Sequence, residues 1–409
     1  MNKHIYNKKI IIILTILIGI YIIISYSISL WKYNTLRSNW PFDLAFHNHV
    51  YWNFIKGNYK ITLTPSKGAN GPFLFKQDHF SLIRFILVPF YLLFPKLETL
   101  LFLYVLIISL GIIPTYLIVR SITDSDLLGL FSCLFYIFIP PIFNLSIYDF
   151  EPLPLCIPFL LFTFYFYNSQ KLIKFIIFTI FTLAVREELM ITIALLGIIG
   201  ILKKEDLKNK MRWIIYPIIL SLIWFILYLV YFYHFHRNLF WFRFLSEKFS
   251  ASFSSLQNSI DSLKSAFIYL YKTWNLFLFL AFLTLLPLVI IIPNLLFFST
   301  LKDEVFLSPY YPDLKYTAII NTFIFISFII SLSKLYNFSK HILLNFSKRI
   351  SFAIINIILI ILIFLLIIFW VNNLSIILQY KSGYTSQEIG EINKLANKID
   401  DSVIVLTSY

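Results

Sequence analysis

The chain has few of the residues that soluble proteins keep on their surfaces. Only 13% of its 409 residues are charged, whereas 59% are hydrophobic, and the mean hydropathy is +0.81. A soluble fold of this length does not need so much apolar surface. The apolar residues form long runs of Leu, Ile and Phe that do not alternate with polar residues, which excludes outer-membrane strands. Runs of this kind predict an all-α polytopic membrane protein.

Cysteine is also scarce, and histidine is badly spaced for a metal. Cys133 and Cys156 are the two cysteines, and both lie inside apolar runs, so we predict neither a disulfide framework nor a metal cluster. His47 and His49 lie two residues apart, which places them on opposing faces of a helix. The sequence therefore argues against a zinc site.

Acidic residues are outnumbered by basic ones. The chain has 34 Lys and Arg against 20 Asp and Glu, a formal net charge of +14. The basic residues lie mainly in short loops between apolar runs, as in the cytoplasmic loops of membrane proteins. We therefore expect membrane lipids as partners and no nucleic acid.

The order of the apolar runs predicts about eleven transmembrane helices. Residues 10–30 follow a lysine-rich start with no small-residue cleavage site after them, which predicts a signal anchor in the cytoplasmic (plasma) membrane with a cytoplasmic N-terminus. Residues 80–94 are too short for a span and contain Arg84 and Pro89, so we expect a helix in the outer interface. The remaining predicted spans are 97–119, 127–145, 152–168, 174–185, 189–202, 213–233, a hairpin over 274–300, 316–332 and 352–371.

Two regions outside these spans differ from the rest. Residues 31–82 form a long outer loop with six Lys and Arg but only two acids, Asp43 and Asp78. Residues 372–409 begin with helical spacing and end in SVIVLTSY, which predicts a strand. We expect a transmembrane domain over 1–371 and the incomplete start of an outer α/β domain over 372–409.

Ionisable residues gather at the outer ends of the first six predicted spans. Such groups are costly near hydrocarbon, so a cluster on one side of the membrane predicts a functional site. Each has a structural alternative: a helix cap for Asp43, a solvated helix start at 78–79, and simple ion pairs within 186–188. The candidates are Asp43, Asp78, His79, Arg84, Asp149, Glu151, Arg186, Glu187 and Glu188.

Four motifs in this order resemble one protein family. They are FD at 42–43, DHFS at 78–81, YDFEP at 148–152 and REE at 186–188. Over most of 31–330 the chain resembles a large prokaryotic family of multi-pass membrane proteins of unknown function, which looks related to the GT-C glycosyltransferases. The chain departs from that pattern twice. Asp149 and Phe150 precede Glu151 where His-Pro-Glu is common, and Lys315 stands before Tyr316 where the family has His-Tyr.

The GT-C resemblance implies a GT-C-like fold and inverting transfer of a sugar from a polyprenyl-phosphate-linked donor to an acceptor. It implies that Asp43, in the first outer loop, is the catalytic base. It further implies that Asp149 and Glu151 hold Mg²⁺ or Mn²⁺, and that Arg84 and Arg186 face the phosphate. The residues that we expect to bind substrate are Asp78, His79, Arg84, Arg186, Glu187, Glu188 and Tyr316.

Two other functions fit the same membrane topology. One is a transporter or flippase for a polyprenyl-linked glycan, and the other is a scaffold for envelope glycan assembly. Transporters often contain inverted repeats and broken helices at the bilayer midplane. This sequence has no internal repeat, and its acids lie towards one face, which favours an enzyme at the interface.

Overall fold

The computed structural model describes residues 8–37, 41–57, 79–202, 207–235, 312–342 and 348–379, most of 264–299, and a few residues between 387 and 394. Throughout these residues the regular structure is helical, and they contain no strand. The strand expected in the tail and the predicted site residue Asp78 both lie outside the described residues. The all-α prediction is confirmed for the rest.

Five helical stretches in the described part are long and apolar enough to cross a membrane. Their backbone groups are paired within each helix, as hydrocarbon requires. The first is α1 (Lys8–Asn34), and the second, Leu97–Thr123, consists of α5 (Leu97–Ser109) and α6 (Ile112–Thr123). The third, Lys210–Tyr231, lies within α12 (Leu207–Phe235). The fourth, Lys315–His341, runs from the end of η5 (Pro312–Thr317) into α17 (Ala318–Ile342), and the fifth, Ile357–Ser375, lies within α18 (Lys348–Gln379).

A sixth candidate span is bent. Helices α7 (Asp126–Phe138) and α8 (Pro140–Ser146) meet at 59°. Pro140 lacks the N–H that would continue the helix, and it forces the preceding Ile139 into an extended conformation, with φ −70° and ψ 119°. The bend turns the end of α8 towards the connection that carries Asp149 and Glu151.

Shorter apolar helices follow. They are η1 (Leu153–Leu155) with α9 (Cys156–Asn168), α10 (Leu172–Val185), α11 (Leu189–Ile199) with η2 (Gly200–Leu202), α15 (Leu276–Phe282), η3 (Leu286–Ile291) and α16 (Ile292–Ser299). The break between α10 and α11 falls at residues 186–188, as the sequence predicted. The expected hairpin over 274–300 contains three short helical pieces, and Pro287 and Pro293 lie within the second and third of them.

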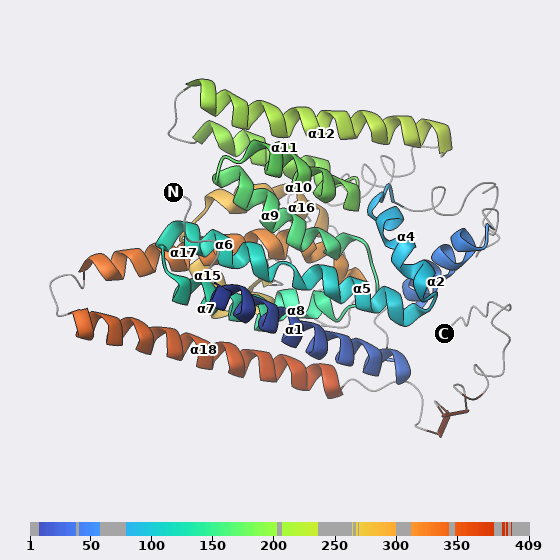
Figure 1. Ribbon diagram of the computed structural model, residues 1–409, viewed down its shortest axis with the longest axis horizontal. Coiled ribbons are helices and arrows are strands. Elements are labelled where there is room, and N and C mark those ends of the chain that lie inside the picture. The colour runs from blue at the N-terminus through green and yellow to red at the C-terminus, as the bar shows by residue number, and fades with distance from the viewer. Residues whose placement is uncertain are drawn as a thin grey trace.

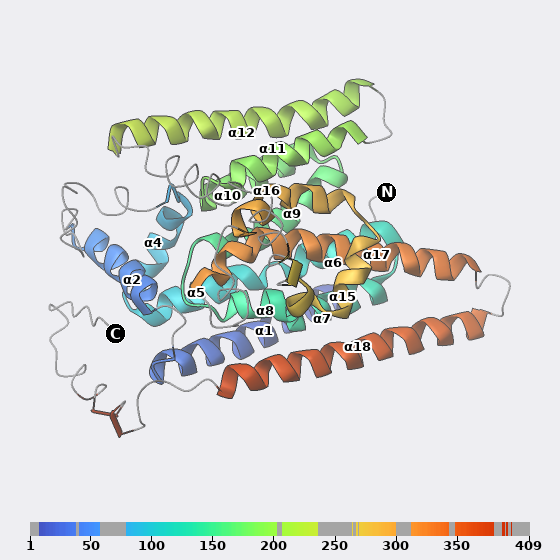
Figure 2. The ribbon, with the colours of Figure 1, turned by 180° about the vertical axis from the view of Figure 1, so that it is seen from behind.

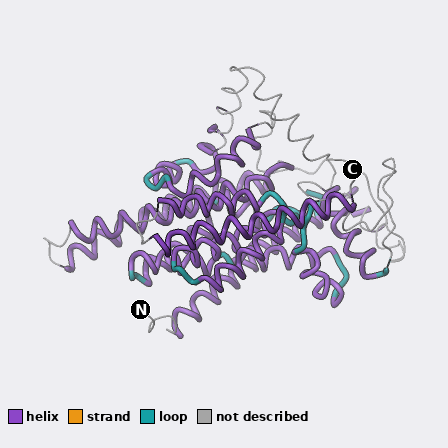
Figure 3. Tube along the Cα trace, turned by 90° about the horizontal axis from the view of Figure 1, so that it is seen from above, coloured by secondary structure: helices purple, strands orange, loops and turns teal. Residues whose placement is uncertain are grey.

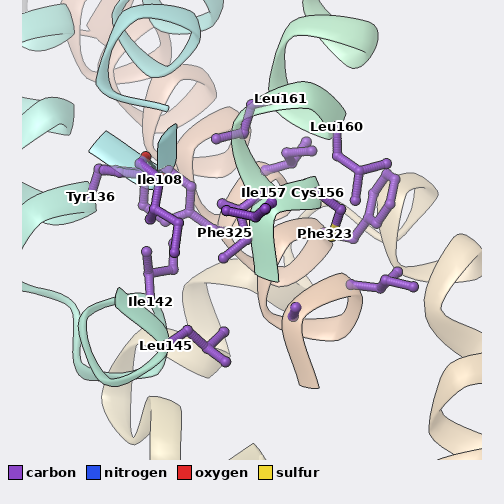
Figure 4. Packing of buried hydrophobic residues seen from close by; sticks show 14 of the residues in the cluster. Ile108, Tyr136, Ile142, Leu145, Cys156, Ile157, Leu160, Leu161, Phe323 and Phe325 are labelled. Atoms are coloured by element: carbon purple, nitrogen blue, oxygen red, sulfur yellow. Dashed lines mark hydrogen bonds between the residues drawn. The ribbon is translucent and has the colours of Figure 1, made fainter. Parts of the chain in front are cut away.

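Helix α17 lies at the centre of the bundle. Of its candidate span 83% is buried, against 17% for α1, 28% for α12 and 11% for α18. Phe323 and Phe325 of α17 pack among Ile108, Tyr136 and the start of α9 (Figure 4). Helices α9 to α12 stack in layers on one side of α17, and α1 and α18 lie on the other (Figures 1 and 2). Seen from above, most helices run roughly along the long axis of the molecule (Figure 3).

Two short helices lie obliquely across one end of this bundle (Figures 1 and 2). They are α2 (Pro41–Ile55) and α4 (Ile83–Leu93). Helix α4 buries Ile83, Leu87 and Tyr91, and it exposes Phe90 and Leu93. It therefore has the short length that the sequence predicted for 80–94, and its two faces differ in burial. The start of α12, the end of α17 and the start of α18 lie at the opposite end of the bundle (Figure 1).

Candidate functional site

Helix α2 carries two site residues on one face. Pro41 begins the helix, where a missing N–H costs nothing, and Asp43 lies in its first turn, where a negative charge is favourable. His47 follows four residues later and therefore lies beside Asp43 on the helix surface. Asp43 is thus inside the helix and does not occupy the cap position.

The connection between α8 and η1 faces α2. Phe150, which is buried, lies 5.4 Å from the His47 ring, 6.0 Å from the Tyr51 ring and 5.9 Å from the Tyr104 ring, centroid to centroid. These aromatic contacts fix the backbone between Asp149 and Glu151. They turn the Glu151 carboxylate towards the charged residues of the site.

Glu151 is the central carboxylate of the site, with only 4% of its surface exposed. Its Oε2 lies 3.3 Å from His47 Nε2 and 3.4 Å from Lys315 Nζ. Its Oε1 lies 3.5 Å from Arg186 Nη1. Burial alone would raise the pKa of Glu151, but the charges of Lys315, His47 and Arg186 outweigh it and hold the pKa well below its ordinary value.

Lys315 joins Glu151 to Asp43. Its ammonium group, at the end of η5, donates to Asp43 Oδ2 as well as lying near Glu151. Burial raises the pKa of Asp43, and the nearby charge of Glu151 raises it further, while Lys315 acts in the opposite direction. Asp43 is therefore a stronger base than an ordinary aspartate.

Arg186, which is completely buried, connects Glu151 to a second pair of residues, His79 and Glu187. Its Nη2 donates to His79 Nε2, and its Cζ lies 5.1 Å from the centre of the Tyr316 ring. Burial disfavours the guanidinium, but the charges of Glu188, Glu151 and Glu187, together with Tyr316, raise the pKa of Arg186 above its ordinary value. Arg186 stays charged.

The second pair consists of His79 and Glu187. His79 Nδ1 donates to Glu187 Oε1 over 2.6 Å, which leaves Nε2 as the acceptor for Arg186. The backbone N–H of Phe80 donates to Glu187 Oε2 over 2.9 Å. Its interactions with His79 and Arg186, together with these hydrogen bonds, lower the pKa of Glu187 despite its burial. Glu188 lies 3.5 Å from Arg186 Nε, and burial raises its pKa.

Two predicted residues lie beside this network. Arg84, on α4, is buried, and its backbone carbonyl accepts a hydrogen bond from the Tyr51 hydroxyl over 3.2 Å. Asp149, also buried, interacts electrostatically with Lys32 at the end of α1. The structure therefore brings together most of the residues that the sequence predicted.

The implied Mg²⁺ or Mn²⁺ does not fit these carboxylates. Both oxygens of Glu151 already face cationic or imidazole groups. In the described part of the chain, no group of three or more His, Cys, Asp or Glu side chains is arranged to hold a metal ion. We therefore assign no step to a metal.

Sequence reasoning missed Lys315 and His47 as members of the site. In the sequence Lys315 appears only as a departure from a His-Tyr motif, and its partner Asp43 lies 272 positions away. The spacing of His47 from His49 bears only on a zinc site. The spacing of four between His47 and Asp43 on a short helix was the signal that could have found it.

Comparison with known proteins identifies the family. Residues 32–409, more than nine tenths of the chain, match the family described as Predicted membrane protein (DUF2079). The chain belongs to this family. No curated protein matches the chain, and no solved structure does. The family match agrees with the membrane-spanning helices of the structure.

Proposed function

We propose that the chain transfers a sugar from a polyprenyl-phosphate-linked donor to an acceptor hydroxyl at the outer face of the cytoplasmic membrane. The observation that carries the proposal is the placement of Asp43. It lies at the end of the bundle, half-buried, in a helix outside the long spans, with a raised pKa and an ammonium group beside it. A carboxylate in such a place can accept a proton from an acceptor.

The proposed reaction moves one proton and one sugar. The acceptor oxygen bonds to the anomeric carbon as the bond from that carbon to the phosphate oxygen breaks. The electron pair of the broken bond leaves with the polyprenyl phosphate, and the acceptor proton goes to Asp43. The positive charges of Arg186 and Lys315 stabilise the negative charge that develops on the phosphate. His79, Glu187 and Glu188 hold Arg186 in place.

The proposal extends to the membrane topology. We propose a GT-C-like arrangement of about eleven spans over 1–371, in which α9, α10 and α11 cross the membrane as short spans beside the long ones. The break at 186–188 then lies on the same side as α2 and α4. Lys340 and His341 in the last turn of α17 support a cytoplasmic opposite end. The exposed apolar residues of α4 support its place in the outer interface.

A direct assay tests this proposal. Purified protein in lipid nanodiscs is incubated with radiolabelled polyprenyl-phosphate sugars, one donor at a time, with membrane extract as the source of acceptor. We expect one donor to be consumed, with release of polyprenyl phosphate and label in a new product. Movement of intact donor across the bilayer of a proteoliposome, without cleavage, would instead indicate a flippase and overturn the proposal.

A further inference from the structure

Helix α1 buries polar as well as apolar side chains against the bundle. Its buried residues are Tyr21, Ser25, Ser29 and Lys32. Spacings of four, four and three place them on one face of the helix, while several isoleucines elsewhere on α1 are exposed. A helix that acted only as an anchor would need no such polar face. The stripe indicates that the position of α1 matters to the residues it contacts.

Two of these side chains contact the end of α8. Ser25 Oγ lies 3.1 Å from Ser146 Oγ, and Lys32 Nζ donates to the carbonyl of Ile147 over 2.9 Å. Lys32 has only 3% of its surface exposed. A buried ammonium group near the membrane is costly unless it has partners, and such residues usually have a function.

The contact from Lys32 gives a hydrogen-bond donor to a carbonyl group at the end of α8. The last carbonyl groups of a helix have no partner inside it, and at the end of α8 one carbonyl in the last turn and that of the C-cap residue Ile147 accept from other helices. Leu145 accepts from the Tyr104 hydroxyl over 2.7 Å, and Ile147 accepts from Lys32. A positive charge is favourable at this end of a helix. Lys32 also interacts electrostatically with Asp149, two residues further along.

We propose that Lys32 is a positioning residue that fixes the connection from Ile147 to Pro152, and through it the Glu151 carboxylate. Lys32 does not touch the reacting groups. It acts at the start of the connection, while Glu151 at its end contacts Lys315, the partner of Asp43. The effect on catalysis rests on the proposed function. The docking of α1 through Lys32 does not.

A crosslink tests the docking without any substrate. Ser25→Cys with Ser146→Cys should form a disulfide on mild oxidation, because the two hydroxyl oxygens lie 3.1 Å apart. The parent chain, in which Cys133 and Cys156 form no disulfide, gives the background. Adding Lys32→Met should reduce the crosslinked fraction several-fold, and adding Lys32→Arg should preserve it. Full crosslinking in the Lys32→Met protein would overturn the inference.

Steady-state kinetics test the positioning. Lys32→Met should lower kcat on the order of 10²-fold with little change in KM, since small displacements of a site cost this much. Lys32→Arg, which keeps the charge and the donor, should recover most of kcat. Tyr104→Phe, which removes the neighbouring donor without removing a charge, should lose less. An unchanged kcat in Lys32→Met would overturn the positioning role. If the parent consumes no donor, the proposed function fails and the crosslink alone decides the docking.

Discussion

At the residue scale, the site is defined by carboxylates that differ in pKa. Burial raises the pKa of Asp43, whereas neighbouring positive charges lower that of Glu151. Two acids close together are thereby given different roles. Asp43 is suited to exchange a proton, and Glu151 is suited to remain ionised and hold Lys315.

The pH dependence of turnover should follow the ionisation of the Asp43 carboxyl group. Because its pKa is raised, the rate should fall on the acid side at a higher pH than for an ordinary aspartate. Lys315→Met removes a charge that lowers this pKa, so the acid limb should move to still higher pH. Lys340→Met, at an exposed lysine near the far end of α17, should leave the limb in place. A pH–rate profile with the same acid limb in Lys315→Met and the parent would refute this assignment.

Removing Glu151 should destabilise the protein. Its lowered pKa contributes stability that is present above the ordinary glutamate pKa and is lost as the pH falls through the folded value. At neutral pH, Glu151→Gln leaves Lys315 and Arg186 without their shared counter-charge, at a cost on the order of 3–5 kcal/mol. Thermal unfolding in detergent measures this loss.

Glu188→Gln is the matched control for that experiment. Glu188 contacts the same Arg186, but its side chain is 25% exposed and its pKa is raised by burial. Neutralising it should therefore lower the melting temperature less than Glu151→Gln does. Equal destabilisation by both variants would mean that Glu151 has no special place in the network.

At the element scale, the junction of α5 and α6 depends on the absence of a side chain. A Cβ at Gly111 would overlap the Tyr136 ring, and the Tyr136 hydroxyl donates to the Ile108 carbonyl over 2.6 Å. Gly111→Ala should push Tyr136 of α7 away from the junction of α5 and α6, and it should lower the melting temperature by several degrees.

Gly19→Ala provides the opposite case on α1. A Cβ there meets nothing within 4 Å, and alanine favours a helix over glycine by about 1 kcal/mol. The melting temperature should stay constant or rise slightly. Equal effects of the two substitutions would contradict the packing described for Gly111.

The elements themselves were largely predictable, and their partners were not. Bilayer thickness fixes the length of an apolar run, so the ends of the first span and the break at 186–188 follow from the sequence. The bend at Pro140 splits one predicted span, because proline lacks the N–H that would continue the helix. The bond between Asp43 and Lys315 joins distant segments, and no local pattern specifies which distant charges meet.

At the scale of the whole molecule, the two ends of the bundle should face opposite sides of the membrane. Lys96→Cys, next to the exposed end of α4, should react with an impermeant maleimide added outside intact cells. Lys340→Cys should react only after the cells are opened. Cys133 and Cys156 are buried and give little background. Labelling of Lys340→Cys in intact cells would invert the topology and remove the site from the outer face.

The central claim is that Asp43 is the catalytic base of a sugar transfer. The measurement that tests it most directly is turnover of the lipid-linked donor by Asp43→Asn, compared with Asp124→Asn, whose side chain is 99% exposed in the α6–α7 connection. The amide can still accept a hydrogen bond from Lys315, so both variants should fold. We expect Asp43→Asn to be slower by on the order of 10²–10⁴-fold and Asp124→Asn to match the parent. Turnover by Asp43→Asn at the parent rate would contradict the account.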